Sequence, residues 1–202
     1  MRNVLLTGVG GQGTVLAAKV LAQAAQAKGW QVRTAETIGM AQRGGSVVSH
    51  VRMGDNGEEV IAPLVAKGTA DMIIAFEPAE AARVLPYLAP DGVMVSATTS
   101  IQPITAALST EPYLAEATIA SLDERLNECA AAPARFVLVD DEAVLSQVGN
   151  RKALNTMLLA FALKTGHLPL SLDDLRDAVR ACVKPRFVEL NLAAIDLVES
   201  KE

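Results

Sequence analysis

The sequence predicts an α/β fold of three layers, with a mixed, mostly parallel sheet, a Rossmann-like N-terminal βαβ unit and a helical C-terminal part. The apolar run Val4-Leu5-Leu6 is followed at once by a glycine-rich loop and then by a helical pattern. Apolar runs of strand length then alternate with helical patterns, and only helical patterns follow residue 141. Half of the 202 residues are hydrophobic, enough for one core, so we expect a single domain over residues 1–202.

The first loop has the composition of an anion-binding site. Gly8, Gly10 and Gly13 match the pattern G-x-G-x-x-G, with Gly11 and Gln12 between them. Glycines let backbone N–H groups approach a ligand, and the N-terminus of the helix that follows adds partial positive charge. The sequence therefore predicts a phosphate or another anion here. A tight strand-to-helix turn without a ligand is the alternative.

Two nucleotide-binding motifs can be compared with this loop. Glu36 lies 23 residues after Gly13, near the spacing of the acid that binds ribose in dinucleotide-binding folds. Gly8 and Gly13 also fit the outer frame of a P-loop, but Thr14 stands where that motif needs lysine. An ATP-hydrolysing P-loop is therefore not expected, whereas a dinucleotide site stays open.

A second strand and a second loop complete the N-terminal unit. Residues 31–36 alternate polar and apolar side chains, which indicates a strand. The next segment lacks periodicity and contains the donor-rich Gln42 and Arg43 beside Gly44 and Gly45. We interpret it as a second anion-contacting loop in which Arg43 faces a phosphate or a carboxylate. A plain surface connection is the alternative.

A hairpin is expected next in the chain. Residues 47–53 and 59–65 both have strand composition, and Gly54-Asp55-Asn56-Gly57 between them is a strong turn signal. Such a hairpin would make the sheet mixed rather than wholly parallel.

The remaining elements follow from apolar runs, caps and breakers. Strands are expected at residues 71–76, 93–97 and 136–140. Helices are expected from Pro78 to Leu85 or Leu88 and over residues 121–131, 141–148, 152–164, 171–183 and 186–199. Ser121 and Ser171 are the expected caps of two of these helices. Residues 98–118 contain Pro103 and Pro112, which exclude a long helix there.

Composition argues against several function classes. The net charge of −5 and the aromatic content of 3% disfavour nucleic-acid binding, which relies on basic surfaces and base stacking. We see no membrane span and no signal peptide, and so expect a soluble cytoplasmic protein. Residues 1–54 carry a net charge of +5 and the remainder −10, which favours an anionic ligand near the glycine loop.

The cysteines and histidines predict no metal site. Cys129 and Cys182 are the only cysteines and form no Cys-x-x-Cys pair, so they cannot by themselves build an iron–sulfur cluster or a zinc site. His50 and His167 are far apart in the sequence and are expected to be structural. No catalytic residue is assigned from the sequence.

Three stretches together resemble one family. They are Gly8-Val9-Gly10-Gly11-Gln12-Gly13, the segment 36–52 that begins Glu36-Thr37-Ile38-Gly39-Met40-Ala41-Gln42-Arg43-Gly44-Gly45, and Gly149-Asn150 before a helix containing Asn155. On these residues the chain resembles the gamma-type subunits of the 2-oxoacid:ferredoxin oxidoreductases over essentially its whole length. Within that group the resemblance is closest to the beta subunits of indolepyruvate:ferredoxin oxidoreductases.

The resemblance implies a reaction that is shared with a partner. In this family a 2-oxoacid is decarboxylated on thiamine diphosphate with Mg²⁺. For this chain the expected substrate is indolepyruvate or another aryl pyruvate, and other 2-oxoacids stay open. Electrons pass through iron–sulfur clusters to ferredoxin, and the acyl group goes to coenzyme A. This chain lacks a Gly-Asp-Gly motif for thiamine diphosphate and the cysteines for a cluster, so a large subunit must supply both. The chain is therefore expected to be inactive alone.

The expected cofactor-binding residues of this chain lie in the two loops and on the strand between them, as part of the coenzyme A region. They are Gly8, Gly10, Gly11, Gln12, Gly13, Glu36, Gln42, Arg43, Gly44 and Gly45.

Two other functions remain as alternatives. A free-standing NAD(P)- or flavin-dependent oxidoreductase of Rossmann type would use Gly8, Gly10, Gly13 and Glu36 as a dinucleotide site. A non-enzymatic interaction module would use the glycine loops only to shape a surface. The expected hairpin and the Gln-Arg-Gly-Gly loop depart from a dinucleotide-binding fold, so we expect the chain to bind no NAD.

Overall fold

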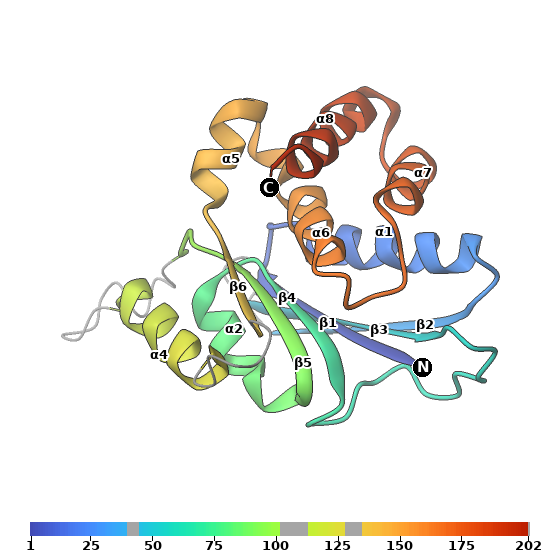
Figure 1. The fold of residues 1–202 in the computed structure, drawn as a ribbon, viewed down its shortest axis with the longest axis horizontal. Coiled ribbons are helices and arrows are strands. Elements are labelled where there is room, and N and C mark those ends of the chain that lie inside the picture. Colours follow the sequence, from blue (N-terminus) through green and yellow to red (C-terminus); the bar gives the residue numbers. More distant parts are fainter. Residues whose placement is uncertain (40–44, 102–112, 128–134, 202) are drawn as a thin grey trace.

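The computed structural model describes residues 1–39, 45–101, 113–127 and 135–201. They form a six-stranded sheet in the order β2-β3-β1-β4-β5-β6, with helices on both faces (Figure 1). The pairs β1–β4, β4–β5 and β5–β6 are parallel, whereas β3 runs antiparallel to both β1 and β2. The predicted three-layer α/β fold with a mixed, mostly parallel sheet is confirmed.

The N-terminal unit has the predicted order of elements. Strand β1 (Arg2–Val9) leads through the glycine loop into α1 (Thr14–Ala27), and β2 (Gln31–Ile38) follows. Strand β3 (Ser46–Gly54) then returns between β2 and β1, so the two parallel strands of the βαβ unit are not neighbours in the sheet.

The predicted hairpin is wrong in its second strand. The turn after β3 is present, but residues 59–65 form no strand. Both edges of β3 are already paired, one with β1 and the other with β2, so no edge is free for a third strand. The mixed character of the sheet comes from this insertion of β3 rather than from a separate hairpin.

The second half of the sheet alternates strands and helices. Its elements are β4 (Ala70–Ala75), α2 (Pro78–Val84), the 3-10 turn η1 (Leu85–Tyr87), β5 (Leu88–Ala97), α4 (Ala115–Asn127) and β6 (Phe136–Val139). The predicted cap at Ser121 is wrong, because α4 already begins at Ala115 in a run that favours helix. The expected end of that helix, near residue 131, lies outside the described residues.

Helices form the rest of the chain, as predicted. They are α5 (Asp141–Val148), the 3-10 turn η2 (Arg151–Ala153), α6 (Leu154–Lys164), α7 (Leu172–Cys182), the 3-10 turn η3 (Pro185–Phe187) and α8 (Val188–Glu199). The predicted cap of α7 is confirmed: Asp174 N–H donates to Ser171 Oγ (3.1 Å), and Ser171 N–H donates to the Asp174 carboxylate (2.8 Å).

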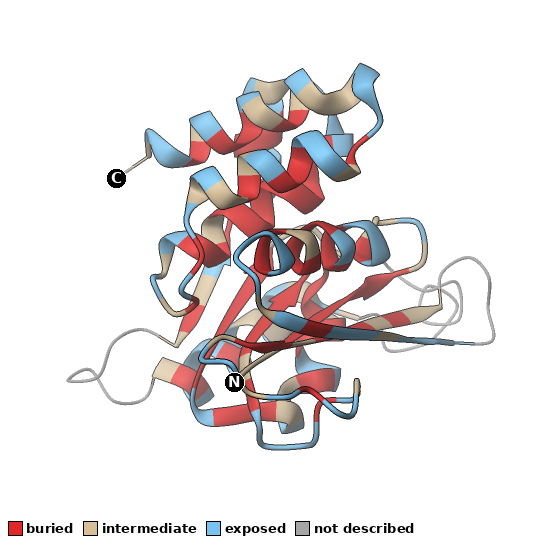
Figure 2. Ribbon diagram, turned by 90° about the vertical axis from the view of Figure 1, so that its right-hand side faces the viewer, coloured by how far each residue is buried: buried red, intermediate tan, exposed pale blue. Residues whose placement is uncertain are grey.

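Buried residues lie on both faces of the sheet (Figure 2), and apolar side chains form a core on each face. The larger core lies between the sheet and α1, α6, α7 and α8, and contains Leu6, Ile74 and Met157. The smaller one lies between the opposite face and α2 and α4, and contains Leu5 and Ile73. Among the described residues, no helix is both long and apolar enough to cross a bilayer.

Candidate functional site

The strand order reverses between β1 and β4: β2 and β3 lie on one side of β1, whereas β4, β5 and β6 follow on the other side. Helix α1 covers one face and α2 the other (Figure 1), so the loops that follow β1 and β4 leave the sheet on opposite sides. In open α/β sheets this is the point where ligands bind, outside the carboxyl ends of the strands. The glycine loop follows β1 at this point, and Phe76 and Glu77 follow β4.

The glycine loop delivers free backbone donors to this point. Gly11 and Gly13 have φ angles of +103° and +85°, and Gly13 is the N-cap of α1 without any side-chain cap. Across the loop and the helix start, the first helical bond runs from Ala17 N–H to Gly13 O (3.0 Å). None of the hydrogen bonds between the described residues uses the N–H groups of residues 14–16, which lie at the positive end of the helix dipole and can donate to a ligand.

Gln12 fastens the loop to the neighbouring strand. Its Oε1 accepts from Val9 N–H (2.6 Å), and its Nε2 donates to Phe76 O (2.9 Å). Gly8 makes room for this side chain, since a Cβ at position 8 would lie 2.6 Å from Gln12 Oε1. Gln12 thus holds the loop in shape by bridging the ends of β1 and β4.

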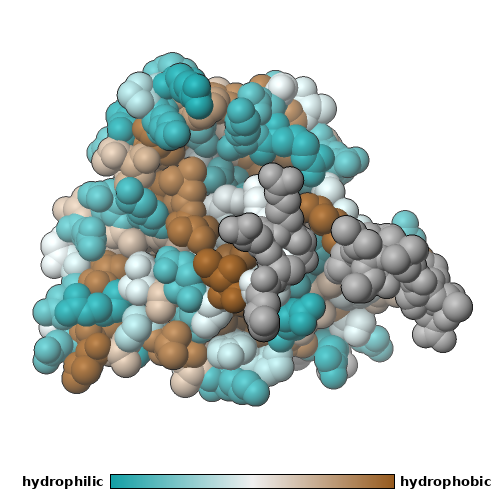
Figure 3. Space-filling model, turned by 180° about the vertical axis from the view of Figure 1, so that it is seen from behind, coloured by the Kyte–Doolittle hydropathy of each residue, from teal (hydrophilic) through white to brown (hydrophobic). Residues whose placement is uncertain are grey.

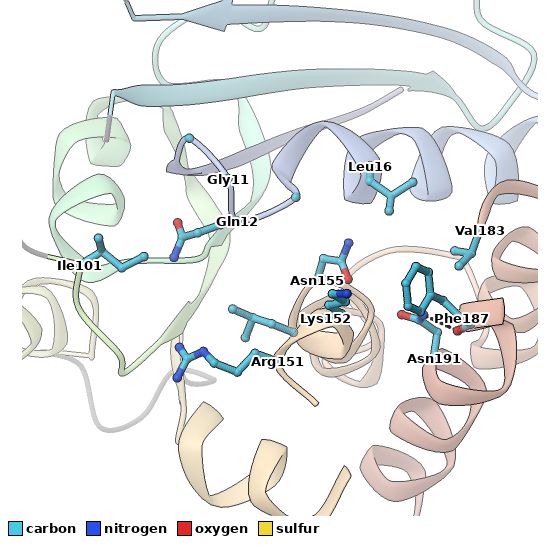
Figure 4. A pocket seen from close by; sticks show the side chains of 13 residues that line it. Gly11, Gln12, Leu16, Ile101, Arg151, Lys152, Asn155, Val183, Phe187 and Asn191 are labelled. Carbon is cyan, nitrogen blue, oxygen red and sulfur yellow. Dashed lines mark hydrogen bonds between the residues drawn. The ribbon is translucent and has the colours of Figure 1, made fainter. Parts of the chain in front are cut away.

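A cavity of about 580 Å³ opens beside the loop on the α1 side of the sheet. Figure 4 shows side chains converging on it from α1, from the η2–α6 segment and from the η3–α8 segment. Its lining residues are Gly10, Gly11, Gln12, Gly13, Leu16, Ile101, Arg151, Lys152, Leu154, Asn155, Val183, Phe187 and Asn191. The cavity is apolar at its sides and carries donors where the chain turns into helices.

A second helix start faces the same cavity. Asn150 caps η2 by accepting from Lys152 N–H (3.0 Å), and α6 follows directly. Arg151 is exposed, with its guanidinium at the cavity edge nearest Ile101 (Figure 4). Lys152 Nζ lies 4.8 Å from the centre of the Phe187 ring. The N-terminus of α1 and two cationic side chains in one hollow make an anion the natural ligand.

A buried polar chain fixes the floor of the cavity. Thr156 Oγ1 donates to Asn191 Oδ1 (2.6 Å), and Asn191 Nδ2 donates to Phe187 O (2.6 Å). This chain ties α6 to the start of α8 and sets where Phe187 lies. Asn155, the neighbour of Thr156, turns its amide toward Gly13 (Figure 4).

Carboxylates gather at the carboxyl end of β4, next to the glycine loop. Glu77 is buried, and its Oε2 accepts from Glu80 N–H (3.0 Å) as the N-cap of α2. Burial raises the pKa of Glu77 above its usual range, although the Glu80 N–H and the Tyr113 hydroxyl both lower it. Burial and then the Glu77 charge raise the pKa of Tyr113. Ser46 Oγ donates to Glu80 Oε2 (2.5 Å), which connects the start of β3 to α2.

The structure brings together only part of the predicted site. Gly10, Gly11, Gln12 and Gly13 line the cavity, and Gly8 lies behind them in β1. Gly45 meets this loop through its carbonyl, which accepts from Gly10 N–H (2.9 Å). Gln42, Arg43 and Gly44 lie outside the described residues.

Glu36 lies apart from these residues. With β3 between β1 and β2, it sits two strand spacings from β1, or about 10 Å. It lines a separate, smaller hollow between α1 and β2, together with Lys19 and Thr34. A ribose-binding acid needs the strand next to β1, a place that β3 occupies here.

Sequence reasoning missed the cationic side of the cavity. Arg151 and Lys152 directly follow Gly149-Asn150, which the resemblance had singled out, so a signal was present. Phe187 and Asn191 reach the cavity only because α8 folds back on α6, a contact that no local pattern reveals. Among the described residues, no group of three or more His, Cys, Asp or Glu is placed to hold a metal ion.

The comparison with known families decides the affiliation of the chain. A family model described as pyruvate ferredoxin/flavodoxin oxidoreductase matches residues 3–198. The chain belongs to this family. The resemblance drawn from the two loops and the Gly149-Asn150 stretch is thereby confirmed.

Within the pyruvate ferredoxin/flavodoxin oxidoreductase family, curated relatives carry the name indolepyruvate oxidoreductase subunit IorB. The relative from Pyrococcus horikoshii is 36% identical over 197 residues, covering 96% of this chain and 93% of the relative. The relative from Archaeoglobus fulgidus is 35% identical over 195 residues, covering 96% and 92%.

Solved structures of the same family share the fold. The gamma subunit of a keto/oxoacid ferredoxin oxidoreductase from Geobacter sulfurreducens matches with a TM-score of 0.65 and 22% identity, covering 98% of this chain and 96% of that chain. Subunit PORC of pyruvate oxidoreductase from Thermotoga maritima matches with a TM-score of 0.66 and 19% identity, covering 98% and 95%. At these identities the likeness concerns the fold.

Proposed function

We propose that this chain is the small subunit of a 2-oxoacid:ferredoxin oxidoreductase that acts on indolepyruvate or another aryl pyruvate. In this proposal it contributes the phosphate-binding part of a coenzyme A site. The observation that supports it most is the cavity in which the N-terminus of α1, Arg151 and Lys152 converge. The names of the curated relatives support the substrate class.

The residues present suit the phosphates of coenzyme A. The N–H groups at the start of α1 and the Arg151 guanidinium bind phosphate oxygens, as helix N-termini and arginine forks do elsewhere. Leu16, Ile101 and Val183 contact the uncharged part of the molecule. Coenzyme A, when bound, supplies the thiol that accepts the acyl group. Gln12 keeps the loop in its ligand-binding shape.

The proposed complex divides the chemistry between two subunits. Thiamine diphosphate with Mg²⁺ and the iron–sulfur clusters belong to a large subunit, which reduces ferredoxin. A structure of 2-oxoglutarate:ferredoxin oxidoreductase from Magnetococcus marinus, described with 2-oxoglutarate, coenzyme A and succinyl-CoA bound, supports a joint architecture. There the fold of this chain matches 31% of a longer chain, with a TM-score of 0.66 and 15% identity.

The surface of the chain favours burial against such a partner. Figure 3 shows a strip of hydrophobic side chains on the face opposite to that of Figure 1. Val15 and Ile38 are exposed around the α1 and β2 ends that flank the glycine loop. Exposed apolar surface of this kind marks contact sites between proteins.

Co-expression tests the proposed function. The chain is produced alone and together with a large thiamine diphosphate/iron–sulfur subunit, and reduction of ferredoxin or viologen is followed with an aryl pyruvate and coenzyme A. We expect turnover in the complex and none with the chain alone. Activity of the isolated chain, or calorimetric binding of NAD to it with micromolar affinity, would contradict the proposal.

Arg43 adds a second anion contact to the proposal. Its segment is continuous with Gly45, whose carbonyl holds Gly10. Arg43→Ala and Arg43→Lys in the complex should raise the apparent KM for coenzyme A or the 2-oxoacid about tenfold or more, as for a lost charge-assisted contact. Arg33→Ala, at an exposed position on β2, is the control. Unchanged kinetics would remove Arg43 from the site, and lost assembly would make it an interface residue.

A further inference from the structure

Asp141 is a fully buried acid whose two oxygens have different surroundings. It is the first residue of α5, and its side chain has no exposed surface. Oδ1 accepts from Thr98 N–H (3.0 Å), Thr98 Oγ1 (3.0 Å) and Thr99 N–H (2.9 Å), so it fastens the turn after β5. Oδ2 is also buried and has no hydrogen-bond partner among the described residues. A buried carboxylate oxygen without a donor is costly unless a positive charge lies nearby.

The nearest such charge belongs to Arg151. Its Nη2 lies 3.9 Å from Asp141 Oδ2, and its Nη1 lies 3.9 Å from Glu142 Oε1. Both separations exceed hydrogen-bond length. No hydrogen bond within the described ranges uses the Arg151 donors, and the same guanidinium lines the cavity. Arg151 is therefore held by charge while its donor fork stays free for a ligand.

The two carboxylates hold Arg151 unequally although their distances are the same. Asp141 is buried, whereas the Glu142 side chain is 73% exposed. Arg151 is itself exposed in both pairs, but the pair with exposed Glu142 is screened from both sides, so at equal distance the interaction with the buried acid is the stronger of the two. The η2 turn that carries Arg151 is fixed separately, because Asn150 Oδ1 accepts from Lys152 N–H.

We propose that Asp141 is a positioning residue that holds the Arg151 guanidinium at the cavity edge, ready to bind a phosphate group. The proposal deepens the proposed function and rests on it for the identity of the ligand. Asp141 itself touches no ligand. It connects the turn after β5 with Arg151, and thereby places the guanidinium opposite the N-terminus of α1 (Figure 4).

Four variants distinguish positioning of the Arg151 guanidinium by Asp141 from a direct effect of the Asp141 charge on anion binding. Asp141→Asn keeps an oxygen for the three Thr98 and Thr99 donors and removes the charge that faces Arg151. Glu142→Gln removes a charge at the same distance but from an exposed side chain. Arg151→Ala removes the guanidinium. The double variant Asp141→Asn/Arg151→Ala tests whether Asp141 acts through Arg151.

The direction in which Asp141→Asn changes the KM for coenzyme A distinguishes the two explanations. Removing a negative charge beside an anion site strengthens anion binding by simple electrostatics. Loss of positioning weakens it instead. We expect the apparent KM for coenzyme A in the complex to rise about threefold to tenfold in Asp141→Asn and about tenfold or more in Arg151→Ala, with little change in kcat. The double variant should match Arg151→Ala, and Glu142→Gln should match the wild type.

A second measurement does not depend on turnover. The isotope-labelled full chain is titrated with inorganic pyrophosphate, and the amide resonances of Gly11 and Gly13 are followed by NMR. Asp141→Asn should weaken this binding in the same proportion. If pyrophosphate binding responds as expected while the complex shows no dependence on coenzyme A, the positioning role stands and the proposed function fails.

Three results would overturn the proposal. They are an unchanged or lowered KM in Asp141→Asn, an equal effect in Glu142→Gln, and an effect of Asp141→Asn that persists in the Arg151→Ala background. Thermal unfolding of Asp141→Asn serves as the check on folding. If that variant unfolds below the assay temperature, the pyrophosphate titrations of Asp141→Asn and of the wild type are compared at a lower temperature at which the variant is folded.

Discussion

Asn155 lies against Gly13, so that a Cβ atom at position 13 would stand 3.1 Å from Asn155 Nδ2. The two residues come from stretches more than a hundred positions apart in the sequence. Their contact joins the N-terminus of α1 to the first turn of α6 and closes the inner end of the cavity. Gly13 is therefore constrained twice, by its φ of +85° and by this neighbour.

This double constraint predicts different costs for two alanine substitutions. In the part of the chain that the structure describes, Gly11→Ala meets no atom within 4 Å and only forces a side chain into φ of +103°, which we expect to cost about 1–2 kcal/mol of unfolding free energy. Gly13→Ala carries a similar strain and must also displace Asn155, so it should cost more. Urea unfolding of both variants measures the difference. Equal losses of unfolding free energy in the two variants would show that the contact with Asn155 adds no cost to Gly13→Ala.

We expect the side chain of Gln12 to contribute more to the free energy of unfolding than a surface glutamine does. Gln12→Ala removes the acceptor of Val9 N–H and the donor to Phe76 O, and leaves groups near the core without partners. We expect a loss of about 1–3 kcal/mol in unfolding free energy. Gln23→Ala, at a half-buried position on α1 with no such bonds among the described residues, is the control. If Gln12→Ala lowers the unfolding free energy by less than Gln23→Ala does, Gln12 does not stabilise the loop by bridging β1 and β4.

His50 predicts a fall in stability with acidification. Its ring is buried, its Nδ1 accepts from Val65 N–H (3.2 Å), and burial lowers its pKa below the usual value. The unfolded chain then binds the proton more readily than the folded chain below about pH 6.5, so stability drops as the pH falls from 7 to 5. His50→Asn keeps an acceptor and should flatten this dependence. His167→Asn is the control, and identical pH profiles for all three proteins would contradict the prediction.

For Glu77 we expect the opposite pH dependence of stability. Burial raises its pKa in the folded state, so the folded chain binds the proton more readily, and stability is lost as the pH rises through the folded-state pKa. Glu77→Gln keeps the acceptor for Glu80 N–H and removes the charge. Its stability relative to the wild type should therefore rise between pH 4 and pH 8 in thermal unfolding. Glu116→Gln, at an exposed position on α4, should show no such trend.

Local signals predicted much of the fold correctly. The glycine loop, the bounds of α1 and the cap of α7 depend on residues close together in the sequence, and each was found as expected. Residues 59–65 failed because strand composition does not reveal whether a partner edge is free. Ser121 failed because its capping pattern lies within a longer helix-favouring run.

By itself, the sequence determined the α/β class, the glycine loop between the first strand and the first helix, and the family resemblance, since these reside in short motifs and local periodicity. Only the tertiary structure decided that β3 lies between β1 and β2, which moves Glu36 away from the loop. It also decided that Arg151, Lys152 and Phe187 share a cavity with Gly13. Both outcomes depend on contacts between segments that are far apart in the sequence. Which strands pair depends on which strand edges are free, and which helices pack together depends on which apolar faces are left to bury. A short stretch of sequence contains neither kind of information.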